Sequence, residues 1–190
     1  AYPGANDTLA TLRTLLKTYL KQGGADPVIV LHGREAGMPA QYPSNWLPIA
    51  LEELASAGIE VWLSALAYGA SAVQLLDAGD LPVRVAKEID QQLVTANEIL
   101  AGIGYPDGVL RRVDMSAPQR PDPVFMPPLQ PATYAASGGK RQLAYMAIDA
   151  LYEQAVASMP RPPLPEVALS DGAPFGMAMV NDTLCTACQS

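Results

Sequence analysis

Two cysteines are the residues of this chain whose type and spacing point most directly to chemistry. Two residues separate Cys185 from Cys188, and the sequence contains no other cysteine. A Cys-x-x-Cys pair lets two thiolates from one turn reach a single metal or cluster, and an iron–sulfur cluster needs four such ligands. The plainer alternative is a pair that binds nothing by itself. A zinc site or a redox thiol pair is a third reading, and neither a second cysteine pair nor a strand–helix–strand context supports it.

Polar residues follow two of the predicted strands. His32 and Arg34 come directly after one apolar run, and Asp77 and Asp80 belong to the acidic turn after another. Ligands of open parallel α/β sheets bind beyond the strand ends, so these four residues are the predicted cofactor-binding or ligand-binding residues. The aspartates could hold a cation or a ribose hydroxyl. The simpler alternatives are that a lone histidine is hydrogen-bonded within the fold and that the aspartates cap the next helix.

The stretch from Gly58 to Asp80 must position these residues. Apolar side chains stand at almost every turn of its first part, up to Tyr68, which predicts a helix with little solvent face. After a break at Gly69, the short run Ala72–Leu76 predicts a buried strand that ends in a polar loop. A helix that leads into a buried strand is one half of a parallel α/β unit.

Further apolar patterns extend this unit. The other predicted strands are Pro27–Leu31, Trp46–Leu51 and Val109–Val113, and the other predicted helices are a leucine-rich one ending at Gly23-Gly24, one from Pro82 to about Leu100 and one from about Gly139 to Ser158. Pro48 lacks a donor, which favours an edge position for its strand. Arg111 and Arg112 are consecutive residues of the predicted strand Val109–Val113, so their side chains must point to opposite faces of the sheet. We therefore predict a three-layer α/β/α fold around a mainly parallel four-stranded sheet, flavodoxin-like or Rossmann-like, with an additional C-terminal helix.

Composition narrows the classes of partner. The chain has 190 residues, 49% of them hydrophobic, which is enough for one real core. A net charge of −7 argues against nucleic acid and against an anionic membrane surface. No run approaches the length of a membrane span, so a soluble, cytoplasmic protein is expected, and homo-oligomerisation is left open. The predicted regions are an α/β domain (1–116), a proline-rich connector (117–136), a helix packing on the domain (137–160) and a C-terminal linker (161–190).

The C-terminal residues carry a resemblance to a known class of proteins. The segment Leu184–Ser190 resembles the start of a bacterial ferredoxin-type motif, Cys-x-x-Cys-x-x-Cys-x-x-x-Cys-Pro, cut short before its third cysteine. Upstream, Trp46–Asp114 resembles the α/β domain of the delta subunits of methyl-viologen-reducing hydrogenases, with Ala65–Val73 at its centre. In that subunit cysteines follow the second and third strands. The matching regions here read Leu51-Glu52-Glu53 and Asp77-Ala78-Gly79.

This resemblance implies a role in electron transfer. The chain would be the cluster-free α/β domain of an iron–sulfur oxidoreductase, acting as a docking and spacing module for 4Fe–4S clusters that lie mainly C-terminal to it. Cys185 and Cys188 would be cluster ligands, and a redox protein or subunit would be the partner. Two alternatives stay open: a flavodoxin-like domain binding flavin or nucleotide around the four polar residues, and a structural interaction domain. No nucleophile, base and oxyanion constellation is present, so catalysis by these residues alone is not predicted.

Overall fold

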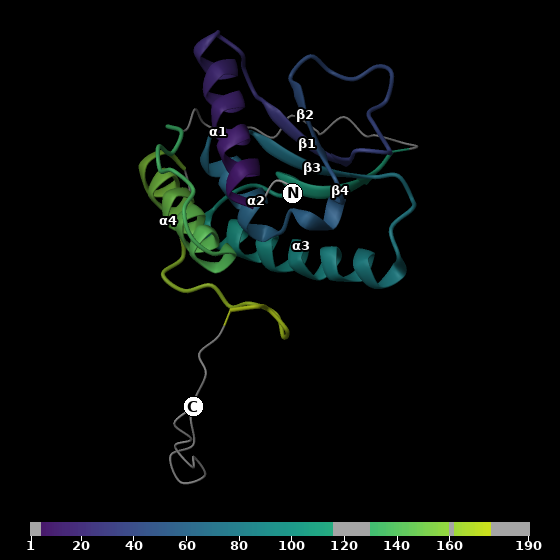
Figure 1. The fold of residues 1–190 in the computed structure, drawn as a ribbon. Coiled ribbons are helices and arrows are strands. Elements are labelled where there is room, and N and C mark those ends of the chain that lie inside the picture. Colours follow the sequence, from purple (N-terminus) through teal and green to yellow (C-terminus); the bar gives the residue numbers. More distant parts are fainter. Residues whose placement is uncertain (1–4, 116–129, 160–161, 176–190) are drawn as a thin grey trace, which may run out of the picture.

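A computed structural model describes residues 5–115, 130–159 and 162–175 (Figure 1). In chain order its elements are α1 (Ala5–Lys21), β1 (Val28–Gly33), β2 (Trp46–Leu51), the short 3₁₀ turn η1 (Leu54–Ser56), α2 (Ile59–Ala67), β3 (Ala72–Asp77), α3 (Val83–Ile103), β4 (Leu110–Asp114) and α4 (Lys140–Ser158). The strands form one all-parallel sheet in the order β2-β1-β3-β4. The predicted α/β class with a parallel four-stranded sheet is confirmed.

The two central strands are those with the most continuous burial, because every residue of β1 and β3 except the last is buried. Val28 to Leu31 of β1 are all buried, and β1 pairs in parallel with β3 from Val28 opposite Ala72 to His32 opposite Leu76. Strands buried on both faces read as unbroken apolar runs, which is why β1 and β3 could be recognised. Strand β2 has a sheet neighbour on one side only, so Pro48 does lie in an edge strand, as its missing N–H required.

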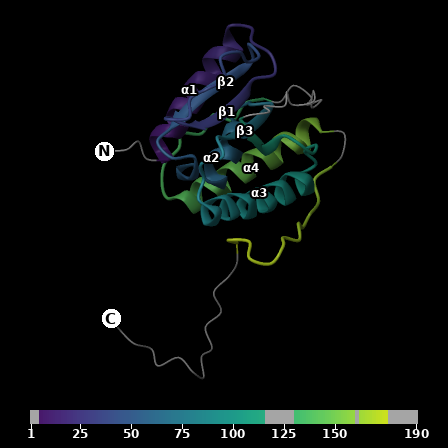
Figure 2. The same cartoon turned by 90° about the vertical axis from the view of Figure 1, so that its right-hand side faces the viewer.

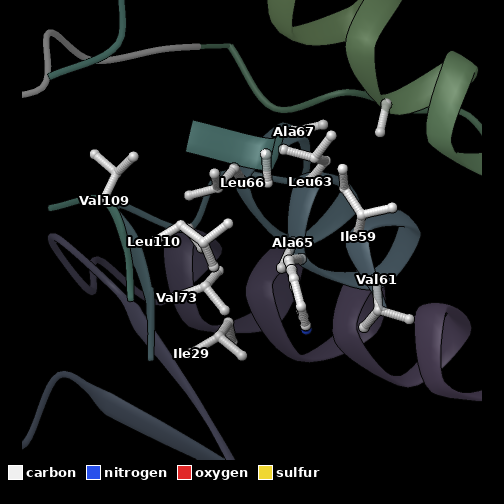
Figure 3. Packing of buried hydrophobic residues seen from close by; sticks show 14 of the residues in the cluster. Ile29, Ile59, Val61, Leu63, Ala65, Leu66, Ala67, Val73, Val109 and Leu110 are labelled. Carbon is white, nitrogen blue, oxygen red and sulfur yellow. The ribbon is translucent and has the colours of Figure 1, made fainter. Parts of the chain in front are cut away.

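Helix α2 is the centre of the packing. All nine of its residues are buried, and it contacts β3, α1, α3 and α4. Figure 3 shows side chains of α2 gathered with Ile29, Val73 and Leu110 of the sheet in one hydrophobic cluster. A helix that is apolar all round has to be enclosed in this way. The prediction that this segment has little solvent face is therefore confirmed.

The two faces of the sheet carry different layers. Helices α1, α2, α3 and α4 all contribute to the larger hydrophobic cluster, which includes Ile29, Leu31, Val73 and Leu75 from the strands. The other face carries a smaller cluster that packs against Met38 of the loop after β1 and against Met115; its strand residues are Val28, Val30, Trp46, Ala72, Leu76 and Val113. The arrangement is consistent with a three-layer α/β fold, and α4 packs on α2 as a further element (Figure 2).

Two segments without helix or strand are tied to the helices by hydrogen bonds. In residues 130–139, Ala132 N–H donates to the carbonyl of Ala67 over 2.8 Å, and Tyr134 Oη donates to Ser64 Oγ over 3.0 Å. In residues 162–175, Leu164 N–H donates to the carbonyl of Gly102 over 2.8 Å. Most of the predicted proline-rich connector lies outside the described residues, but its last part is hydrogen-bonded to α2 through Ala132 and Tyr134.

The strand order sets where a ligand would bind. The chain moves outward from β1 to β2 and then returns past β1 to β3, so the direction of connection reverses between β1 and β3. In open parallel sheets ligands bind beyond the carboxyl ends of the strands at such a reversal. Residues that follow β1 and β3 are therefore the first place to look for a site.

Candidate functional site at the carboxyl edge of the sheet

His32 lies at the end of β1 and is buried. Its Nδ1 lies 2.9 Å from the carbonyl oxygen of Gly33, which can only accept, so Nδ1 carries the proton of this hydrogen bond. His32 is paired in register with Leu76, which places its side chain on the sheet face of the smaller cluster. The histidine is thus hydrogen-bonded within the fold, as the simpler alternative from the sequence proposed.

Arg34 lies just beyond β1 and is paired with a residue that follows β2. Its Nε is 3.5 Å from Glu52 Oε2, and both side chains are largely exposed, at 62% and 45%. Exposed ion pairs at this distance contribute little to stability. The Glu52 carboxylate thus faces a guanidinium of this chain.

Asp77 ends β3, and its carboxylate is occupied by partners from this chain. Its Oδ2 is 2.6 Å from Arg112 Nη1, and its Oδ1 accepts the N–H of Gly79 over 2.8 Å. Arg112 also makes a bidentate pair with Asp90 of α3, with Nε to Oδ1 at 2.9 Å and Nη2 to Oδ2 at 2.7 Å. The hydrogen bond to Asp90 is the largest influence on Arg112 and raises the pKa of the guanidinium, while burial opposes it.

The acidic turn after β3 does not cap the next helix. The N-cap position of α3 is Pro82, and no side chain makes a capping hydrogen bond there. The alternative that Asp77 and Asp80 cap α3 is therefore wrong: the Asp77 side chain bonds back to Gly79 and across to Arg112, and Asp80 is exposed. Proline at the N-cap cannot supply a side-chain oxygen, so the helix begins without one.

The four predicted residues do not converge on one face. His32 shares a face with Leu76, and Asp77 is the next residue along β3, so its side chain points the other way. Arg34 engages Glu52 at the β2 end, away from the Arg112 pair. An open cavity of about 830 Å³ between α3 and β4 does include Asp77, together with Asp90, Asn97 and Arg112.

Arg112 and Asp90 are the residues of this site that the sequence left unassigned. The alternation rule correctly separates Arg111 from Arg112, and the described geometry puts Arg112 on the α3 side of β4. A further signal was available, because diagonal neighbours on adjacent strands also lie on the same face: Asp77 pairs in register with Asp114 and Arg112 with Leu75, so the aspartate and the arginine can form a diagonal ion pair. The acidic partner on α3 could be found only from the packing.

Gln74, in the middle of β3, is a fully buried amide on the opposite face. It is 0% exposed, it pairs in register with Val30 and Arg111, and neither its Oε1 nor its Nε2 has a hydrogen-bond partner among the described residues. An amide buried without partners forfeits the hydrogen bonds it would make to water in the unfolded chain.

Gln74→Leu is therefore expected to raise the free energy of unfolding, by about 1–3 kcal/mol, because an apolar side chain of similar size removes two unsatisfied groups. Urea denaturation followed by circular dichroism measures the change. Gln154→Leu is the matched control: Gln154 is also buried, but its Nε2 donates to Ala67 O over 2.8 Å and its Oε1 accepts from Tyr105 over 3.2 Å. That variant should lose stability. A destabilised Gln74→Leu protein would contradict the assignment of an unpaired amide.

Metal-ligand geometry is absent from the described residues. Within 5–115, 130–159 and 162–175, no three or more His, Cys, Asp or Glu side chains are grouped so that they could hold a metal ion. Cys185 and Cys188 lie outside these ranges. No helix in the same ranges has the length and apolar content needed to cross a membrane.

Comparison with protein families finds no family model that matches this chain, and comparison with curated proteins finds no match. The function is therefore inferred from the chain's own residues.

Proposed function

We propose that this chain is the α/β scaffold region of an iron–sulfur electron-transfer protein. In this proposal Cys185 and Cys188 supply two thiolate ligands of a 4Fe–4S cluster, and the α/β body docks and spaces the redox partners. The observation that carries the scaffold role is the pairing of Asp77. Both of its oxygens are engaged within the chain, by Gly79 and Arg112, so this carboxylate, at the position where ligands of such sheets bind, serves the fold.

The α/β body is not itself offered as the cluster site. Glu52 and Asp77 occupy the regions where the resembled hydrogenase subunit has cysteines, and each faces an arginine of this chain. Carboxylates held by guanidinium groups do not fit the thiolate donor set of an iron–sulfur cluster. We therefore propose Cys185 and Cys188 as two of the cluster ligands. The remaining thiolates would come from outside this sequence. When bound, such a cluster carries electrons between donor and acceptor.

The test uses the full gene product that contains this sequence, reconstituted anaerobically with iron and sulfide. We expect visible charge-transfer absorbance and an EPR signal after reduction. Cys185→Ser and Cys188→Ser should each lose most of both signals, because serine does not replace a thiolate in the cluster. Thr186→Ser is the matched control: it lies between the cysteines and leaves both thiols in place. A gene product without any cluster signal would overturn the proposal.

A further inference from the structure

A second cavity lies away from the sheet edge, among three helices. It has a volume of about 380 Å³ and is bounded by the first turn of α2, the middle of α3, the first turn of α4 and residues 172–175. Its size is at the lower end of the range typical of small-molecule sites. Its polar lining residues are Glu60, Glu88, Gln91, Gln92, Thr95, Lys140 and Arg141.

Glu60 is the feature of this cavity that packing does not explain. It is 3% exposed, in a helix whose other buried residues are almost all apolar, and its Oε1 makes no hydrogen bond within the part of the chain that the structure describes. The nearest cation is Lys140, whose Nζ lies 3.3 Å from that oxygen without hydrogen-bond alignment and whose side chain is 64% exposed. A buried carboxylate is costly unless it is both paired and hydrogen-bonded. Glu60 is thus a buried carboxylate beside the cavity that is ion-paired with Lys140 but makes no hydrogen bond through Oε1 to a described residue.

Charges of opposite sign come from different helices around the cavity, and two of them are close together, because Lys140 Nζ lies 3.3 Å from Glu60 Oε1. Glu60 and Glu88 come from α2 and α3, whereas Lys140 and Arg141 form the first turn of α4. The N-cap of α4 is Gly139, which offers no side-chain cap, so the first N–H groups of this helix add to the positive wall. Cations in a first turn are unfavourable for the helix itself. The two walls together suit a ligand with a positive and a negative end.

The remaining lining residues fix the cavity and provide an apolar surface. Gln92 Oε1 accepts the N–H of Ile59 over 3.4 Å, and Gln91 Nε2 donates to the carbonyl of Gly172 over 3.3 Å, so these amides hold α3 to α2 and to the segment 162–175. The apolar lining consists of Ile59, Ala144, Pro174 and Phe175. A ligand that fits would therefore carry an apolar group beside its two charges.

We propose that this cavity binds a free α-amino acid with an apolar side chain. Its ammonium group donates to Glu60 Oε1, its carboxylate lies against Lys140, Arg141 and the first turn of α4, and its side chain contacts Ile59 and Phe175. This binding site is separate from the cluster proposed above and does not depend on it.

The experiment screens the individual L-amino acids against the protein by thermal shift and then titrates those that raise the melting temperature by calorimetry. A ligand that binds only the native state raises that temperature. Apolar amino acids should do so. Two analogues of L-leucine test its two charged groups one at a time. 4-Methylpentanoate lacks the ammonium group and isopentylamine lacks the carboxylate, and both should bind more weakly than leucine.

Two variants test the assigned contacts. Glu60→Gln should weaken binding about tenfold or more, because it replaces a charge-assisted hydrogen bond by a neutral one. Glu153→Gln is the matched control, since Glu153 is exposed on α4 and lies outside the cavity lining, and it should leave the dissociation constant unchanged. The proposal is overturned if no amino acid raises the melting temperature, if 4-methylpentanoate binds as tightly as leucine, or if Glu60→Gln binds as tightly as the wild type.

Discussion

Replacing Trp62 by alanine is expected to lower the free energy of unfolding by about 3–5 kcal/mol. Trp62 is 1% exposed and belongs to α2, the helix that the sheet, α1, α3 and α4 enclose. Removing a large aromatic side chain there loses its burial and leaves a cavity that the surrounding elements can only partly close. Urea denaturation followed by circular dichroism gives the free energy, and the second tryptophan, Trp46, is kept unchanged.

Two further substitutions make this result specific. Val156→Ala, at a side chain that is 60% exposed on α4, should change stability by no more than about 0.5 kcal/mol. Trp62→Phe should cost much less than Trp62→Ala, because phenylalanine keeps a six-membered aromatic ring there and removes the indole Nε1, which is buried with no hydrogen-bond partner among the described residues. If Trp62→Ala and Val156→Ala destabilise the protein equally, α2 does not hold the core together as the structure indicates.

The fold could be predicted because its central elements are extreme in composition. The segment that became α2 has apolar residues at nearly every position, and β1 and β3 are mostly apolar, with Gln74 the one polar residue inside β3, so few other arrangements could bury them. The ends of elements were less predictable. Helix α3 extends to Ile103 rather than stopping near Leu100, because Gly104 in a left-handed conformation, at φ 101°, ends it.

The sites were harder to predict, because they depend on which side chains tertiary packing brings together. Asp77 was recognised, but its partner Asp90 stands 13 residues later on α3, and no sequence pattern links the two through Arg112. Glu60 was overlooked for the opposite reason. The run around it was interpreted by its hydrophobic residues, although a single carboxylate in a helix with no solvent face is itself a signal of function.

Arg112→Met is expected to lower the free energy of unfolding by about 2–3 kcal/mol, since hydrogen bonds to charged groups are among the stronger ones. The variant keeps most of the side chain's length but removes three short contacts, to Asp77 at 2.6 Å and to Asp90 at 2.7 and 2.9 Å. It also leaves Asp77, whose side chain is only 12% exposed, without its cation. The cost stays below that of a fully buried pair because the Arg112 side chain is 28% exposed.

Arg34→Met is the matched control for this variant, because the same substitution there removes one exposed ion pair at 3.5 Å and should cost at most about 0.5 kcal/mol. Double-mutant cycles with Asp77→Asn and Asp90→Asn divide the Arg112 effect between its partners. Asp90 accepts two of the three hydrogen bonds and has the largest influence on the Arg112 pKa, but its side chain is 50% exposed, whereas that of Asp77 is 12% exposed. We expect burial to decide, so that Asp77 shows the larger coupling. Equal losses for Arg112→Met and Arg34→Met would mean that the Asp77 carboxylate is not held by this chain. The sheet edge would then again be open to a ligand, and the scaffold role would lose its main support.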